Sequence, residues 1–280
     1  MTIKYKVRYT SSRVRGTIEA ASASRCEAFA GDDLAVTRKG AATRYELYYW
    51  ASIQGRGEFV RLALEEAGAP YVDVSRIVGG EERMLRLLEE TALACPPFAP
   101  PFLRAGRRLI GQTANILQFL GERHALAPKS EAGRLWTHQL QLTLADLIVE
   151  VHDTHHPIAG RLYYEDQRPE ARRRAADFVE NRLPKYFRYF EGVLTRNPSG
   201  PAHLVGARVT YADLSLFQAV AGLYYAFPKA MARTAKRYPH VMALHSRVAS
   251  RPRIAAYLAS DRRLAFNQQG IFRHYTELDA

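Results

Sequence analysis

Two kinds of apolar periodicity divide the chain near residue 126. From Tyr45 to that point, short runs typical of strands alternate with segments whose apolar positions recur every three to four residues, as in amphipathic helices. Gly68 stops the first helix, and Ala105-Gly106 separates two short strands like the turn of a hairpin. The order β-α-β-α-β-β-α predicts a mixed sheet with a helical cover. Strands are expected over residues 45–50, 70–74, 102–104 and 107–110, and helices over residues 54–67, 81–93 and 112–123.

Beyond Ser130 the pattern is helical almost throughout. Thr210 and Asp213 have the spacing of a capping box, and Val209 and Leu214 are placed as its hydrophobic staple, so a core helix is expected to begin there. Long helices are predicted over residues 135–158, 170–194 and 211–225, with shorter ones through residues 238–259.

The first 44 residues show neither a sustained strand alternation nor a helical apolar stripe. We therefore expect residues 1–44 to be a poorly ordered N-terminal extension. Arginine and serine without an acidic residue before Glu19 also resemble an organelle presequence, but the segment has no apolar run long enough for a secretory signal.

The charge balance is basic, with 40 Lys and Arg against 28 Asp and Glu and a net charge of +12. Residues 1–44 hold nine basic and four acidic residues, so five of the twelve charges belong to the extension. The rest is spread thinly, which favours small anionic substrates over nucleic acid. No run approaches the roughly 18 apolar residues that cross a bilayer. We expect neither a nucleic acid nor a membrane as partner.

Cysteine and histidine positions give little support for redox or metal chemistry. Cys26 and Cys95 are too few for a disulfide scaffold, so a reducing, cytoplasmic location is expected. No Cys-x-x-Cys follows the first strand, which excludes a disulfide oxidoreductase. His152, His155 and His156 share one helix face and could hold a metal, but such clusters are more often polar capping or interface groups. We expect no metal.

Four motifs, in this order, resemble those of the cytosolic glutathione transferases, and the tyrosine-type, sigma-like class in particular. They are Tyr45-x-Leu47-x-Tyr49-Trp50 followed by Gly55-Arg56-Gly57-Glu58, Pro101 before Phe102-Leu103, Gln112-Thr113-Ala114-Asn115-Ile116-Leu117, and Thr210-Tyr211-Ala212-Asp213. The resemblance covers residues 45–260. It implies an α/β, thioredoxin-like, glutathione-binding domain over residues 45–126 and an all-α helical domain over residues 130–280.

The resemblance also implies a function. A glutathione S-transferase stabilises the thiolate of its co-substrate glutathione and conjugates it to apolar electrophiles, in detoxification. Proteins of this family are typically cytoplasmic homodimers. The alternative is a non-catalytic protein of the same fold that binds a ligand or partner.

The chemistry of such a site can be stated independently. A free thiol has a pKa of about 8.5, and only its thiolate is a good nucleophile. A neutral tyrosine hydroxyl can stabilise the thiolate by a charge-assisted hydrogen bond, and a nearby guanidinium adds a favourable field. The resemblance gives these catalytic roles to Tyr49 and Arg56. The loop between them is one residue longer than is usual, so Tyr48 or Ser52 could present the hydroxyl instead.

The resemblance assigns the remaining substrate-binding residues. Gln112 and Thr113 open a helix, whose free amide groups favour an anion, and would hold the γ-glutamyl end of glutathione. Asp146 would reach the γ-glutamyl ammonium across a dimer interface. Pro101 matches the family's cis-proline, but Pro100 before it has no N–H for the cysteinyl backbone of glutathione. Glutathione binding is therefore expected to lack one hydrogen bond.

Overall fold

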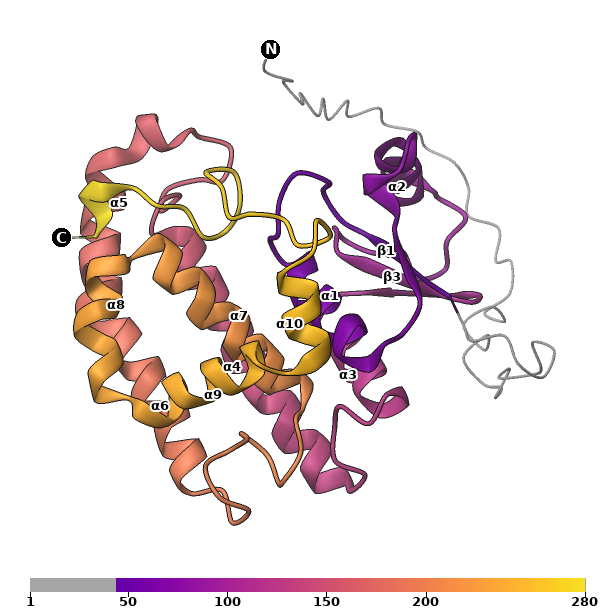
Figure 1. The fold of residues 1–280 in the computed structure, drawn as a ribbon. Helices are drawn as coiled ribbons and strands as arrows, with labels where there is room; N and C mark the ends of the chain where they lie inside the picture. Colours follow the sequence, from indigo (N-terminus) through magenta and orange to yellow (C-terminus); the bar gives the residue numbers. More distant parts are fainter. Residues whose placement is uncertain (1–43, 280) are drawn as a thin grey trace, which may run out of the picture. The chain divides into compact units, whose positions relative to one another are not determined.

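The computed structural model describes residues 44–279 (Figure 1). The predicted N-terminal extension lies outside the described residues except for Arg44. Residues 45–123 form a four-stranded mixed sheet with three helices, and its strand order is β2-β1-β3-β4. The predicted order β-α-β-α-β-β-α is confirmed. The strands are β1 (Tyr45–Tyr48), β2 (Tyr71–Asp73), β3 (Phe102–Ala105) and β4 (Arg108–Gly111), and the helices are α1 (Gly57–Ala67), α2 (Gly80–Glu89) and α3 (Thr113–Arg123).

Strand pairing places alternate side chains of β1 in two different apolar clusters. β1 runs parallel to β2 and antiparallel to β3, with Leu47 opposite both Asp73 and Leu103. Leu47 joins the large core formed with α1, α3 and the helical part of the chain. Tyr48 belongs to a smaller cluster with Phe102 and Met84, on the side of the sheet covered by α2 (Figure 1). The alternation of the strand thus sends Leu47 and Tyr48 to opposite faces of the sheet.

Two helix ends follow local rules. Gly68 ends α1 in the left-handed conformation, with φ 63°, as its lack of a Cβ allows. The second helix was expected over residues 81–93, but α2 already ends at Glu89. There the carboxylate of Glu90 accepts the Ala92 amide at 3.0 Å, and the chain enters the proline-rich segment before β3.

The rest of the described chain is helical, as predicted. The helix expected over residues 170–194 is instead two α-helices joined by a π-helical turn, Phe178–Arg182. The helix expected from residue 135 begins earlier, because the Ser130 side chain accepts the Gly133 amide at 3.2 Å and caps its first turn. The helices are α4 (Glu131–Asp153), α5 (Arg168–Asp177), α6 (Leu183–Thr195), α7 (Tyr211–Ala226), α8 (Pro228–Thr234), α9 (Pro239–Ala249) and α10 (Pro252–Leu258).

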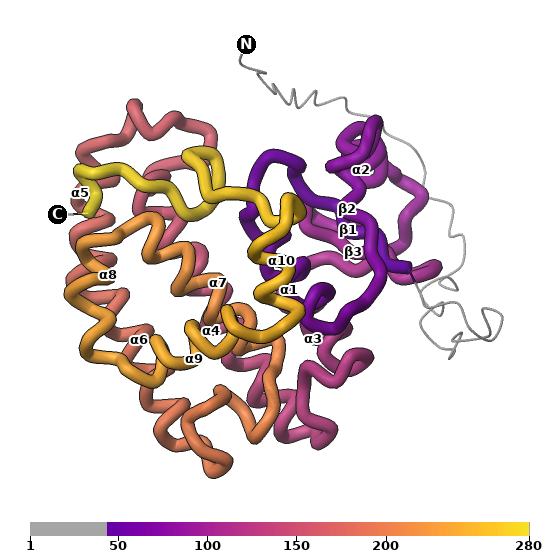
Figure 2. Tube along the Cα trace, viewed as in Figure 1, coloured from indigo at the N-terminus to yellow at the C-terminus, as the bar shows by residue number. Residues whose placement is uncertain are grey.

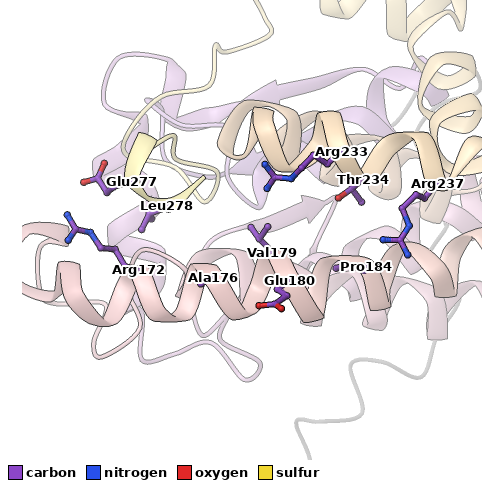
Figure 3. Close-up of a pocket in the computed structure, with 10 residues that line it drawn as sticks. All are labelled: Arg172, Ala176, Val179, Glu180, Pro184, Arg233, Thr234, Arg237, Glu277 and Leu278. Carbon is purple, nitrogen blue, oxygen red and sulfur yellow. The ribbon is translucent and has the colours of Figure 1, made fainter. Parts of the chain in front are cut away.

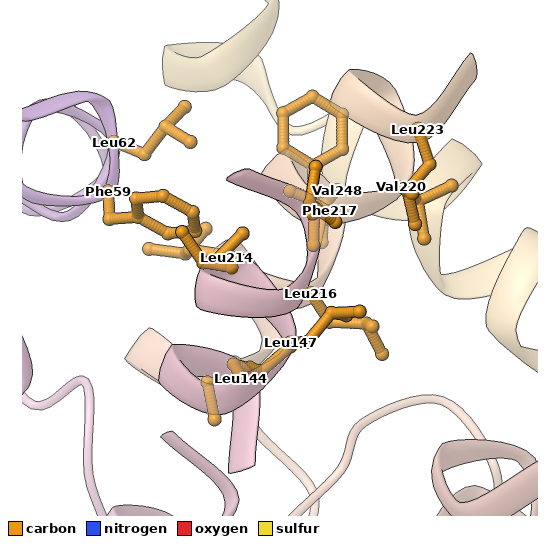
Figure 4. Packing of buried hydrophobic residues seen from close by; sticks show 14 of the residues in the cluster. Phe59, Leu62, Leu144, Leu147, Leu214, Leu216, Phe217, Val220, Leu223 and Val248 are labelled. Atoms are coloured by element: carbon orange, nitrogen blue, oxygen red, sulfur yellow. The ribbon is translucent and has the colours of Figure 1, made fainter. Parts of the chain in front are cut away.

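Helix α7 lies at the centre of the core. Its buried leucines pack against Phe59 and Leu62 of α1 and against Leu144 and Leu147 of α4 (Figure 4). The predicted capping box is present at its start, where the Asp213 carboxylate accepts the Thr210 amide at 2.7 Å. No helix among residues 44–279 has the length and apolar character needed to cross a membrane.

A long tail follows α10 and returns along the molecule (Figure 2). The Asn267 side chain donates to the Ser52 carbonyl at 2.8 Å, and the Gln54 side chain donates to the Leu264 carbonyl. Further on, Tyr275 stacks on Tyr164 with ring centroids 3.8 Å apart. The tail therefore connects the loop before α1 with the helical part. The proposed domain boundary between residues 126 and 130 stays a prediction.

Candidate functional site

One cavity of about 340 Å³ contains three of the predicted site residues. Arg56, Gln112 and Thr113 line it together, from the start of α1 and the start of α3. Helix α4 supplies the other wall. The remaining lining residues are Phe59, Ala114, Asn115, His138, Gln141, Leu142, Ala145 and Ile148.

The start of α3 is suited to an anion. No side chain caps this helix, so its first amide groups remain available along the axis of the helix dipole. Gln112 has φ 67° and ψ 121°, which is strained for a residue with a Cβ. Thr113 Oγ1 is buried and has no hydrogen-bond partner. A carboxylate bound here would supply the missing acceptor and use the free amide groups.

Tyr49 lies directly beneath the loop that leads into α1. Its ring packs against Gly55 and Gly57, where a Cβ would lie 2.1 Å from Tyr49 Oη and 2.6 Å from the ring respectively. The Arg56 backbone N–H donates to Tyr49 Oη at 2.8 Å. Burial raises the pKa of Tyr49, while this N–H and the Arg56 charge oppose the shift. The hydroxyl therefore stays protonated at neutral pH.

The two alternative hydroxyl donors are placed differently. Tyr48 is fully buried, donates to the Glu46 carboxylate at 2.8 Å and stacks on Phe102. Burial and the Glu46 carboxylate raise the pKa of Tyr48 to about 12. Ser52 is exposed, and its carbonyl holds the tail residue Asn267. Neither residue lines the cavity, and the role given to Tyr49 stays a prediction.

The remaining predicted site residues lie outside this cavity lining. The Pro100-Pro101 peptide bond is cis, and the buried Pro101 leads into β3. Asp146 is exposed on α4, next to the lining residue Ala145. The structure thus groups Arg56 with Gln112 and Thr113, and it leaves Tyr49, the two prolines and Asp146 outside that group.

Sequence analysis did not identify two polar residues of α4 that line the cavity. Gln141 is 2% exposed, and its Oε1 has no partner; His138 Nδ1 is also buried without a partner. A sequence signal existed for Gln141, which lies among the apolar positions Leu140, Leu144 and Ile148 on the buried side of α4. A polar residue at a core position requires a partner.

A buried ionic network supports the start of α1. Arg61, fully buried, contacts Glu58 at 3.2 Å and Asp73 at 2.7 Å. Glu58 also accepts from Tyr257 at 2.9 Å and pairs with Arg263 of the tail. The conspicuous Glu58 of the Gly55-Arg56-Gly57-Glu58 motif is therefore a structural residue, which the sequence pattern did not reveal.

The histidine cluster is packed at the end of α4. His155 is 1% exposed, its Nε2 bonds the Ile271 carbonyl at 2.8 Å, and its ring contacts His152 and His156. Burial lowers the pKa of His155 to about 2 and that of His156 to about 4. Among residues 44–279 no group of three or more His, Cys, Asp or Glu side chains is arranged to hold a metal ion.

A second, larger cavity of about 460 Å³ lies between α5, α6, α8 and the end of the tail (Figure 3). Val179 and Leu278 line it with apolar side chains, and Arg172, Glu180 and Glu277 give it charges of both signs. None of the predicted site residues lines it.

Comparison with known proteins finds a likeness to glutathione transferases. Residues 152–261 match the family described as glutathione S-transferase, C-terminal domain. The glutathione S-transferase of Plasmodium falciparum is 22% identical over 218 residues, which cover 76% of this chain and 94% of that protein. Glutathione S-transferase P 1 of Xenopus laevis is 25% identical over 223 residues, covering 78% of this chain and 93% of that protein.

A solved structure is similar to this chain in fold as well. Prostaglandin synthase D of Nilaparvata lugens superimposes with a TM-score of 0.62 at 19% identity, covering 79% of this chain and all of that one. The small mixed sheet, the helical part and the matched C-terminal region point the same way, and the expected fold is confirmed. The chain thus carries a glutathione S-transferase C-terminal domain over residues 152–261, and along most of its length it is similar in sequence and fold to glutathione transferases.

Proposed function

We propose that the protein is a glutathione S-transferase that binds glutathione at the start of α3 and conjugates its thiolate to an apolar electrophile. The observation that carries the proposal is the uncapped α3 start, with the unpartnered Thr113 Oγ1, in one cavity with Arg56. A peptide carboxylate fits this combination of free donors and positive charge. Electrophile conjugation in the cytoplasm, for detoxification, extends the same proposal.

Tyr49 would stabilise the thiolate. Its Oη is the acceptor for the Arg56 N–H, and no acceptor in the described part of the chain takes its own proton. That proton is available for a sulfur atom outside the protein. The N–H bond polarises the hydroxyl and makes it a better donor, because hydrogen bonds in a chain strengthen one another. Donation to the thiolate lowers the pKa of the thiol and increases the fraction of nucleophile.

Assembly as a homodimer is part of the proposal. Leu135, Leu142 and Val149 are spaced seven residues apart on α4 and are 66%, 48% and 48% exposed. Asp146 lies on the same face, four residues after Leu142 and three before Val149. An apolar stripe of this kind supports burial against a second subunit, where Asp146 would face the partner's site.

The test compares conjugation of glutathione to a generic aromatic halide over pH 6 to 8 for the wild type, Tyr49→Phe and Tyr48→Phe. We expect Tyr49→Phe to lose about tenfold or more in kcat/KM, or about 1.4 kcal/mol of transition-state stabilisation, because it lacks the donor. Tyr48→Phe should stay within about twofold. Loss of activity in Tyr48→Phe alone would transfer the donor role to Tyr48.

The alternative is a non-catalytic protein that uses the same cleft for a ligand or partner. Two observations favour it: Pro100 has no N–H to offer, and Tyr49 is only 4% exposed. Calorimetry with glutathione separates the two functions. If the wild type neither binds nor conjugates glutathione, the transferase function is rejected and the non-catalytic function remains.

A further inference from the structure

The larger cavity, of about 460 Å³, lies apart from the proposed transferase site and has a size that suits a small ligand. One wall is the continuous run of α5, the π turn and α6. The opposite wall is α8 with the short helix η5 (Ala235–Arg237) that follows it (Figure 3). The end of the tail lies at one side, through Glu277 and Leu278. No residue that lines the proposed glutathione cavity also lines this one.

The π turn gives the first wall an unusual feature. This turn, Phe178–Arg182, contributes Val179 and Glu180 to the lining of the cavity. A π turn within an α-helix is rare and is often found at functional sites. Its position in the wall is therefore a second indication, independent of the volume, that the cavity serves a ligand.

Arginines stand at the two ends of the cavity. Arg172 lies on α5 at one end, and Arg237 lies on η5 at the other, where its side chain extends toward Pro184 (Figure 3). Twelve residues separate Arg172 from Pro184 along the helical wall, which corresponds to about 18 Å. Both arginines are exposed, and neither forms an ion pair with another residue of the described chain, 44–279. Their charges are thus available to a ligand.

Between these ends the lining is apolar. Ala176 and Val179 follow Arg172 along the same helical wall, and Leu278 of the tail lies nearby. Figure 3 shows Val179 pointing into the space between this wall and α8. The order along the cavity is therefore a cation, an apolar stretch and a second cation.

The acidic residues of the lining do not cancel this positive charge. Three arginines, with Arg233 of α8 as the third, line the cavity together with two acidic residues, Glu180 and Glu277. The Glu277 carboxylate already accepts the Tyr164 hydroxyl at 2.9 Å. The net charge of the lining favours an anionic ligand over a cationic one.

We infer that this cavity binds an α,ω-dicarboxylate, a linear apolar chain with a carboxylate at each end, and that Arg172 binds one carboxylate and Arg237 the other. A guanidinium suits a carboxylate because it offers two parallel N–H donors. The apolar chain of the ligand lies along Ala176 and Val179. The inference goes beyond the proposed transferase function and uses none of its residues.

The test measures the affinities of three probes by calorimetry at low salt. Dodecanedioate has both carboxylates and the length, dodecanoate has the length but one carboxylate, and butanedioate has both carboxylates but a short chain. The variants are Arg172→Gln and Arg237→Gln, which remove one charge each. Arg173→Gln and Lys236→Gln are the matched controls, since both residues are exposed neighbours that do not line the cavity. Thermal unfolding checks that each variant is folded.

We expect the wild type to bind dodecanedioate about fivefold or more tightly than dodecanoate, because only the dicarboxylate engages both arginines. Butanedioate should bind at least about tenfold more weakly than dodecanedioate, since it cannot reach both ends and covers little apolar surface. Arg172→Gln and Arg237→Gln should each lose about fivefold for dodecanedioate and bind the two long probes about equally. Both control variants should behave as the wild type does.

Three results would overturn the inference. The wild type might fail to bind dodecanedioate, or bind it no more tightly than dodecanoate. An unchanged affinity for dodecanedioate in both Arg172→Gln and Arg237→Gln would place the ligand elsewhere on the protein. Glutathione conjugation by the same two variants should stay at the wild-type rate. This readout keeps a failure of the inference distinct from a failure of the proposed function.

Discussion

At the scale of single residues, the surroundings of Tyr49 depend on two glycines. Gly55 has φ 44°, and its missing Cβ leaves room for Tyr49 Oη beneath the loop. The same backbone turn directs the Arg56 N–H onto that hydroxyl. The position of the proposed donor thus depends on the absence of a Cβ at Gly55 and Gly57 as well as on the tyrosine itself.

We predict that Gly55→Ala will be much more damaging than Gly106→Ala. Gly106 also has a positive φ, 61°, but an added Cβ there would meet no atom within 4 Å. Gly106→Ala should cost only the backbone strain, about 1 kcal/mol, whereas Gly55→Ala adds the clash with Tyr49 and should cost about 3 kcal/mol. Urea unfolding measures both. Equal losses would show that the Tyr49 ring can move aside.

At the scale of elements, the start of α7 is fixed by one buried carboxylate. Asp213 is fully buried and accepts the Thr210 and Leu204 amides, each at 2.7 Å, together with the Thr210 hydroxyl. Burial raises the pKa of Asp213, and these donors together with His203 counteract the shift. The residue thus joins the helix to the loop before it.

Asp213→Ala should therefore destabilise the protein by about 3 kcal/mol, because two buried amides lose their acceptor. Ser130→Ala removes a cap of the same kind from α4, but this cap is exposed and should be worth about 1 kcal/mol. Chemical denaturation of both variants gives the comparison. A loss near 1 kcal/mol at Asp213 would mean that water reaches the freed amides.

The elements also show what a single sequence can predict. The capping box, the Gly68 stop and the order of strands and helices along the chain depend on neighbouring residues, and the structure confirms them. The missing hydrogen-bond partner of Gln141 Oε1 and the contacts of the tail depend on segments far apart in the chain. No local sequence pattern therefore predicts them. The π turn within the expected helix over residues 170–194 likewise left no periodicity signal.

At the scale of the whole molecule, the histidines at the end of α4 attach the tail to the helical core. His155 reaches the Ile271 carbonyl, and further along Asp279 accepts the Lys229 and Ala230 amides at the start of α8. His155 is packed in its neutral form. Protonation of His155 at low pH should therefore weaken the attachment of the tail.

We predict that stability falls as the pH drops below about 6.5. In the folded protein the pKa of His155 is about 2 and that of His156 about 4, against 6.5 when unfolded. The unfolded chain binds more protons between these values, so each histidine costs up to about 1.4 kcal/mol per pH unit there, and none above pH 6.5. Thermal unfolding at pH 7.5 and 5.5 measures the loss.

The variant His155→Gln serves as the comparison for that experiment. It lacks one of the titrating groups, so its melting temperature should fall less between the two pH values than that of the wild type. Parallel curves for the two proteins would assign the acid sensitivity to other groups.

The contacts between the loop before α1 and the tail have a consequence for recombination among relatives. Ser52 and Gln54 of the loop are held by Asn267 and Leu264, more than two hundred residues later. The loop before α1 and the tail after α10 are thus held together, although they lie near opposite ends of the described chain. A chimaera that inherits either segment from a relative without the other would leave the buried Gln54 side chain without its acceptor, so the two segments should be exchanged only as a pair.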